Sequence, residues 1–106
     1  MSEFAIVVTQ RAEGDLLSAA EWIARVSPQA AHRWLQEIRG AMEGLNPFPG
    51  AHPFARENPT HERELRQLSH GNYRIIYFVD DSLIVVASVR HTKREPHAPG
   101  ELDTVD

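Results

Sequence analysis

One charged side chain interrupts the most apolar stretch of this 106-residue chain. Arg74 lies between Tyr73 and Ile75, within a run of aromatic and β-branched residues that is typical of a strand. A guanidinium in such a run is costly unless its head reaches water or an anion. Its planar fork matches the two oxygens of a carboxylate or a phosphate. The sequence therefore indicates Arg74 as the first candidate for binding an oxyanion.

Further ionisable residues stand at the ends of the neighbouring strands that we expect. The segment Arg90–Arg94 is basic and includes His91, whose imidazole could donate a proton, while Glu64 opens a short strand and could accept one. The catalytic candidates are therefore Arg74, His91 and Glu64. The candidates for a target- or anion-binding surface are Arg66, Arg74, Arg90, His91 and Arg94.

Each candidate also has a structural interpretation. Arginines at strand ends are most often solvated, and a histidine there is more often a surface or capping residue than a catalyst. Arg74 could form an internal salt bridge with Glu62 or Glu64, which would contribute about 0–1 kcal/mol if exposed. Because side chains alternate along a strand, we expect Arg74 to point away from the helices, onto an open sheet face beside His91.

Three stretches together predict four strands. Residues 72–91 predict two strands joined by a tight turn at Asp80, Asp81 and Ser82, which are residues that bend the backbone. Phe4–Thr9 is rich in β-branched residues and predicts a first strand, after which Thr9 can cap a helix. Glu64–Leu68 predicts a short strand before the central pair.

Two amphipathic helices are expected between the first and second strands. Apolar residues recur at helical spacing from Ala12 to Val26 and from Ala31 to Leu45. Ser27-Pro28 combines a capping residue with proline at the first helical position, so the helices should form an antiparallel hairpin. Residues 46–62 contain four prolines and predict an irregular connection.

These elements predict an α+β fold of order β-α-α-β-β-β, with a two-helix antiparallel hairpin packed on one face of a small, mostly antiparallel sheet. We expect one domain over residues 1–95 and a flexible acidic tail over residues 96–106, where prolines and acids are scattered.

The charge distribution argues against a protein that grips nucleic acid mainly through phosphates. The net charge is −4, and only the middle of the chain, residues 56–94, is mildly basic. There is no cysteine, no apolar run of spanning length and no basic amino-terminal region, so we expect a cytoplasmic protein without membrane association. No histidine pair shows metal-ligand spacing and no glycine-rich phosphate loop occurs, so no metal and no cofactor are expected.

The order of elements and several motifs together resemble the RelE/ParE superfamily of bacterial toxins, over roughly residues 4–94. The residues that carry the resemblance are the Ser27-Pro28 break, the helix exit Asn46-Pro47-Phe48-Pro49-Gly50, Leu65-Arg66-Gln67-Leu68, Tyr73-Arg74-Ile75-Ile76-Tyr77, and Val89-Arg90-His91-Thr92-Lys93-Arg94-Glu95. The Tyr-Arg-Ile-Ile-Tyr strand and the terminal His-x-x-Arg run are the most specific of these motifs.

The resemblance implies the toxin of a type II toxin–antitoxin, or plasmid stabilisation, module. Its partner would be a small antitoxin encoded beside it, with a carboxy-terminal segment that is disordered alone. An exposed sheet edge could also support a homodimer. The RelE-like branch of the superfamily cleaves messenger RNA in the ribosome, and the ParE-like branch poisons DNA gyrase.

Several features favour the ParE-like branch. Nuclease members often carry several lysines, whereas this chain has only Lys93. Attack of a 2′-hydroxyl needs a base, an acid and a cation, which Glu64, His91 and Arg74 could supply. Many of those RNases, however, place a Tyr or a second catalytic group where Thr92 and Lys93 follow His91. We therefore favour a toxin that binds gyrase; the alternatives are a ribosome-dependent endoribonuclease and a decayed, non-toxic member that binds only antitoxin.

Overall fold

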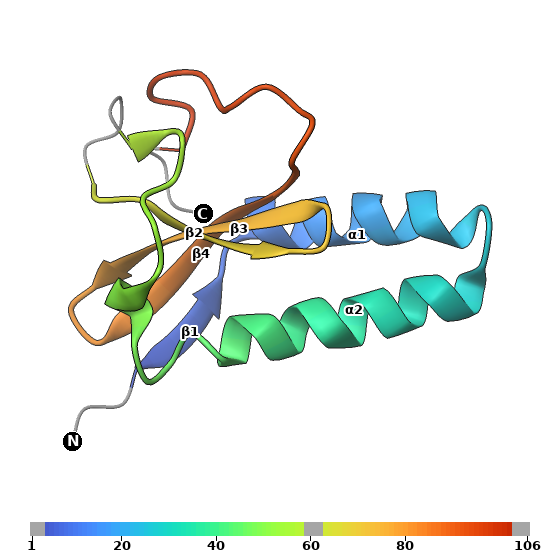
Figure 1. Cartoon of the computed structure of the whole chain (residues 1–106), viewed down its shortest axis with the longest axis horizontal. Coiled ribbons are helices and arrows are strands. Elements are labelled where there is room, and N and C mark those ends of the chain that lie inside the picture. Colours follow the sequence, from blue (N-terminus) through green and yellow to red (C-terminus); the bar gives the residue numbers. More distant parts are fainter. Residues whose placement is uncertain (1–3, 59–62, 103–106) are drawn as a thin grey trace.

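The computed structural model describes residues 4–58 and 63–102 (Figure 1). It confirms the predicted α+β fold and the order of its elements. The elements are β1 (Ala5–Val8), α1 (Gln10–Ala24), α2 (Pro28–Glu43), a 3₁₀ turn η1 (Pro49–Ala51), β2 (Arg66–His70), β3 (Tyr73–Asp80) and β4 (Leu83–His91). The short strand before the central pair begins two residues later than expected, at Arg66 instead of Glu64.

The four strands form one sheet of order β1-β4-β3-β2. Strand β1 runs parallel to β4, and the other two pairs are antiparallel. The predicted acidic turn joins β3 to β4, and Asp81 adopts φ 58° there, a conformation that short polar side chains tolerate. Across β3 and β4, Tyr73 lies opposite His91 and Arg74 lies opposite Arg90. This register decides which candidate residues share a face.

Both helices begin at the residues that the sequence indicates as caps. The Thr9 hydroxyl oxygen accepts from the Ala12 N–H at 3.1 Å and donates to the Val86 carbonyl at 3.0 Å, so it joins the start of α1 to β4. The Ser27 hydroxyl accepts from the Ala30 N–H at 3.1 Å at the start of α2. Figure 1 shows α1 and α2 as an antiparallel hairpin connected by a short turn.

The sheet buries apolar side chains on both of its faces. The helix-facing core contains Ala12, Leu16, Ile38, Met42, Leu45, Ile75, Tyr77, Ile84, Val86 and Val89. A second cluster on the opposite face contains Ala55, Leu65, Ile76, Phe78, Val85, Ala87 and Leu102. The second face is therefore covered as well, and the expectation that this face is open is wrong.

Two irregular segments provide that cover. The proline-rich connection follows the edge of β2, where the Ala55 N–H donates to the Leu65 carbonyl at 2.9 Å and Phe54 forms a bridge with Arg66. The second segment is residues 95–102, which we call the C-terminal strap. Within it, His97 is only 7% exposed and Leu102 only 2% exposed. We expected a flexible tail over residues 96–106. Residues 96–102 of this range belong to the strap and differ from that expectation, and residues 103–106 lie outside the described residues. Within the described ranges, no helix is both long and apolar enough to cross a membrane.

Candidate functional site

Arg74 is fully buried beneath the two irregular segments. Its side chain is 0% exposed, and its two terminal nitrogens donate to the two carboxylate oxygens of Glu57, each at 2.9 Å. One of them also donates to the Gln67 side-chain oxygen at 2.9 Å. The Nε of Arg74 is buried without a hydrogen-bond partner among the described residues. The planar fork of Arg74 therefore binds an oxyanion, as its chemistry predicts, but the anion belongs to the same chain.

The expected position of Arg74 on an open face beside His91 is wrong. The register puts Arg74 and His91 on opposite faces of the sheet. His91 pairs with Tyr73 and shares its face, and Arg74 directly follows Tyr73 in β3, so its side chain points to the other face. The expected salt bridge between Arg74 and Glu64 is also wrong, because Glu57, from the proline-rich connection, holds the guanidinium of Arg74. Glu62 lies outside the described residues.

The Glu57 carboxylate is ionised and tightly held. Burial by itself would raise its pKa, but the Arg74 guanidinium and the backbone N–H of His97 outweigh burial and lower the pKa from 4.5 to about 2. The His97 N–H donates to this carboxylate at 2.9 Å. The strap therefore contributes a hydrogen bond directly to the buried ion pair.

His97 is the centre of the contacts that the strap makes. Its Nε2 lies 2.9 Å from the Ser88 hydroxyl, and its Nδ1 contacts the Glu101 carboxylate. The Ser88 hydroxyl donates to Asp15 at 2.8 Å, so the chain of contacts reaches α1. Burial lowers the pKa of His97, although the Glu101 carboxylate acts in the opposite direction.

Arg90 lies on the same face as Arg74 and is also engaged by the strap. Its Nε donates to the Glu95 carbonyl at 2.7 Å, and a terminal nitrogen lies 3.2 Å from the ring nitrogens of His97. Burial, followed by the positive charge of Arg94, lowers the pKa of Arg90. Both arginines of this face are therefore occupied by contacts within the chain.

His91 and Arg94 line a groove on the helix side of the sheet. The groove has a volume of about 370 Å³ and lies between α1 and the ends of β3 and β4. The ring of Tyr73 packs edge-on against His91 at 5.1 Å. Trp22 is 65% exposed at the rim of the groove. An exposed tryptophan beside basic groups is a combination enriched at protein–protein contacts.

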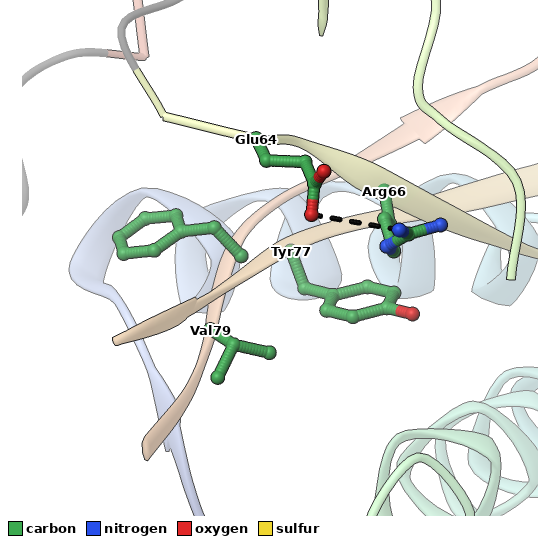
Figure 2. A pocket seen from close by; sticks show the side chains of 5 residues that line it. Glu64, Arg66, Tyr77 and Val79 are labelled. Atoms are coloured by element: carbon green, nitrogen blue, oxygen red, sulfur yellow. Dashed lines mark hydrogen bonds and ion pairs between the residues drawn. The ribbon is translucent and has the colours of Figure 1, made fainter. Parts of the chain in front are cut away.

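Arg66 and Glu64 form a third location, shown in Figure 2. They line a pocket of about 70 Å³ with Tyr77 and Val79, and the Glu64 carboxylate approaches Arg66 at 3.5 Å. The guanidinium of Arg66 stacks on the Phe54 ring at 4.6 Å and donates to the His52 carbonyl at 2.6 Å. Arg66 is thus largely used in fastening the proline-rich connection, and the pocket is too small for more than a few atoms.

The candidate residues therefore divide among three places instead of forming one constellation. The structure brings His91 together with Arg94, Arg74 with Arg90, and Glu64 with Arg66. Sequence analysis missed Glu57, His97 and Asp15 as partners. The one available signal was the buried arginine itself, which requires an anion somewhere in the chain. No group of three or more potential metal ligands occurs in the part of the chain that the structure describes.

A two-helix hairpin on one face of a four-stranded sheet of this order is the architecture of the RelE/ParE toxin superfamily. The family described as the ParE toxin of the type II toxin–antitoxin system parDE matches residues 6–96, and the chain belongs to this family. It is a toxin of a type II toxin–antitoxin system.

Individual relatives come from both branches of the superfamily. The chain is 31% identical over 90 residues to Toxin RelE2 of Caulobacter vibrioides, covering 84% of this chain and 96% of that protein. A chain of the chromosomal ParDE system from P. aeruginosa superimposes with a TM-score of 0.72 at 16% identity, covering 85% of this chain and 97% of that chain. A chain of the RelBE2 toxin–antitoxin complex from Mycobacterium tuberculosis gives a TM-score of 0.54 at 22% identity, with 86% and 93% covered. The two structural likenesses concern the fold.

Proposed function

We propose that this protein is a ParE-like toxin that arrests growth by binding a host target, DNA gyrase, and that a cognate antitoxin neutralises it. It acts in the cytoplasm and serves a plasmid-stabilisation type of module. It works by occupying a surface of its target and not by breaking a bond itself.

One observation carries this proposal over the nuclease alternative. Arg74 is the strongest candidate for a cation at a scissile phosphate, yet it is fully buried and bound by both oxygens of Glu57. His91, the candidate acid, lies on the opposite sheet face, and Glu64, the candidate base, is 62% exposed beside a third pocket. General acid–base catalysis needs these groups within hydrogen-bond reach of one substrate. Their separation supports a binding mode of action.

The groove beside α1 is the surface that we assign to partner binding. It combines the guanidinium of Arg94 and the imidazole of His91 with the exposed indole of Trp22. Such a surface suits an acidic segment that carries an apolar anchor. We propose that the carboxy-terminal segment of the antitoxin is a segment of this type and that it becomes ordered on binding. Arg66, Arg74 and Arg90 remain predictions as target-binding residues.

The alternative function is a RelE-like, ribosome-dependent endoribonuclease. The observation that favours it is the 31% identity to a protein named Toxin RelE2. The third alternative, a decayed member that only binds antitoxin, fits the closed state of Arg74. These three functions differ in what happens when the protein is produced in cells.

Induced expression in a bacterial host tests the proposal. A gyrase-binding toxin should arrest growth, linearise plasmid and produce filamentous cells with an SOS response, and co-expressed antitoxin should reverse these effects. Messages cut at codon boundaries with normal plasmid supercoiling would instead establish the nuclease. Normal growth with folded protein would establish the decayed member.

A further inference from the structure

The C-terminal strap does more than cover apolar surface. Residues 95–102 contribute one donor to Glu57, one carbonyl acceptor to Arg90 and one imidazole between Arg90 and Ser88. All three contacts are made to groups on or over the sheet face that carries Arg74. The strap therefore interacts mainly with the ionic groups of that face and not only with its apolar side chains.

The strap is fastened at its far end by few interactions. Leu102 inserts into the second core cluster and is 2% exposed. Glu101 contacts Arg11 of α1, which donates to its carbonyl at 3.0 Å and approaches its carboxylate at 3.7 Å. The Glu101 carboxylate also holds the ring of His97 and the Ala98 N–H. No α-helix or strand forms in residues 95–102, so backbone hydrogen bonding holds the strap less firmly than it holds the sheet.

The buried ion pair depends on this fastening. An arginine and a glutamate that are both excluded from water interact strongly, because no solvent competes with their hydrogen bonds. The strap covers this pair and donates its own N–H to the carboxylate. Once solvent reaches the pair, its interaction falls toward that of an exposed ion pair, and another anion can compete with Glu57. The unpaired Nε of Arg74 is a donor that such an anion could use.

We propose that residues 95–102 act as an autoinhibitory strap over the arginine-bearing sheet face. When the strap is docked, Glu57 and His97 occupy Arg74 and Arg90, and neither guanidinium is free for an external oxyanion. When the strap is released, the two arginines become accessible together. This proposal concerns access to the sheet face and goes beyond the proposed function, because it applies whichever molecule the toxin targets.

Substitution of the strap anchor tests the proposal in the full chain. Leu102→Ser removes the apolar contact and leaves every charge in place, and Leu17→Ser, at a leucine that is 58% exposed on α1, is the matched control. Amide hydrogen exchange reports strap release. The N–H groups of His97 and Ala98 should exchange about tenfold to a hundredfold faster in Leu102→Ser, in line with the burial of one leucine. The amides of β3 and β4 should be unaffected.

Titration with inorganic phosphate reports access to the arginines, followed through the side-chain Nε–H signals by NMR. The wild-type protein and the Leu17→Ser control should show no change at Arg74, whereas Leu102→Ser should show a saturable change at Arg74 and Arg90. Adding Arg74→Lys to Leu102→Ser should remove most of the phosphate affinity, because the planar fork is lost.

Two results would overturn the proposal. One is fast exchange at His97 in Leu102→Ser without any phosphate response at Arg74, since the strap would then not control access. The other is unchanged exchange at His97, since the strap would then not be held by its anchor. If Leu102→Ser does not fold, Glu101→Gln keeps the leucine and weakens the contacts to Arg11 and His97, and the same two measurements decide. Both use purified protein, so they stand or fall separately from toxicity.

Discussion

The ion pair between Arg74 and Glu57 should dominate the effect of substitutions on the sheet face away from the helices. We consider Glu57→Gln, which preserves the shape of the side chain and removes its charge. Both partners are almost completely buried, with side-chain exposures of 0% for Arg74 and 3% for Glu57. Removing one partner of such a pair leaves the other charge buried without compensation.

The magnitude can be obtained in two ways. The pKa of Glu57 falls from 4.5 to about 2 on folding, and each pKa unit corresponds to about 1.4 kcal/mol, so the ionised carboxylate is stabilised by about 3 kcal/mol. Breaking a buried ion pair typically costs about 3–5 kcal/mol. We therefore expect Glu57→Gln to lower the free energy of unfolding by about 3 kcal/mol at neutral pH, which is a large part of the stability of a small domain.

Urea unfolding at pH 7 measures this difference. The control is Glu64→Gln, because the Glu64 side chain is 62% exposed and its pair with Arg66 should contribute no more than about 1 kcal/mol. The double variant Arg74→Gln with Glu57→Gln should lose less stability than the two single variants added together, because each single variant strands its partner. A loss below about 1 kcal/mol for Glu57→Gln would refute the reasoning, since the pair would then behave as an exposed one.

Four further outcomes are expected. Because the folded-state pKa of Glu57 lies below its unfolded value, its contribution to stability is complete above about pH 4.5 and is lost as the pH falls toward 2; acid unfolding of Glu57→Gln should lack this component. Ser27→Ala should lower the free energy of unfolding by about 1 kcal/mol in urea titrations, because the Ala30 N–H loses its cap. Tyr77→Phe should cost about 1 kcal/mol in the same assay, because the buried Pro49 carbonyl loses its donor. Arg94→Ala should weaken antitoxin binding in calorimetric titrations without changing Tm, whereas Lys93→Ala, a substitution outside the groove lining, should leave affinity unchanged.

The fold was predictable because its signals are local. Helical spacing, the caps Thr9 and Ser27 and the turn at Asp81 each act over a few residues, and the structure places all of them where the sequence indicates. Local signals that agree in this way are characteristic of sequences that specify one structure.

The surroundings of Arg74 were not predictable because its partners are distant in sequence and lie in segments without regular structure. Glu57 is 17 residues away in the proline-rich connection, and the strap contact between His97 and Glu57 spans 40 residues. Composition made residues 96–102 resemble a solvated tail, but the one large apolar side chain there, Leu102, completes a core cluster. One buried leucine leaves no periodic pattern, so only the tertiary structure could identify it.

The central claim is that this toxin acts by binding gyrase and not by cutting RNA. The most direct measurement is a supercoiling assay with purified gyrase, relaxed plasmid and the purified chain, alongside a ribosome-programmed messenger RNA as a cleavage substrate. We predict that supercoiling falls as the concentration of the chain rises, that the antitoxin restores it, and that the message stays intact. Unimpaired supercoiling together with codon-dependent cleavage of the message would contradict the claim.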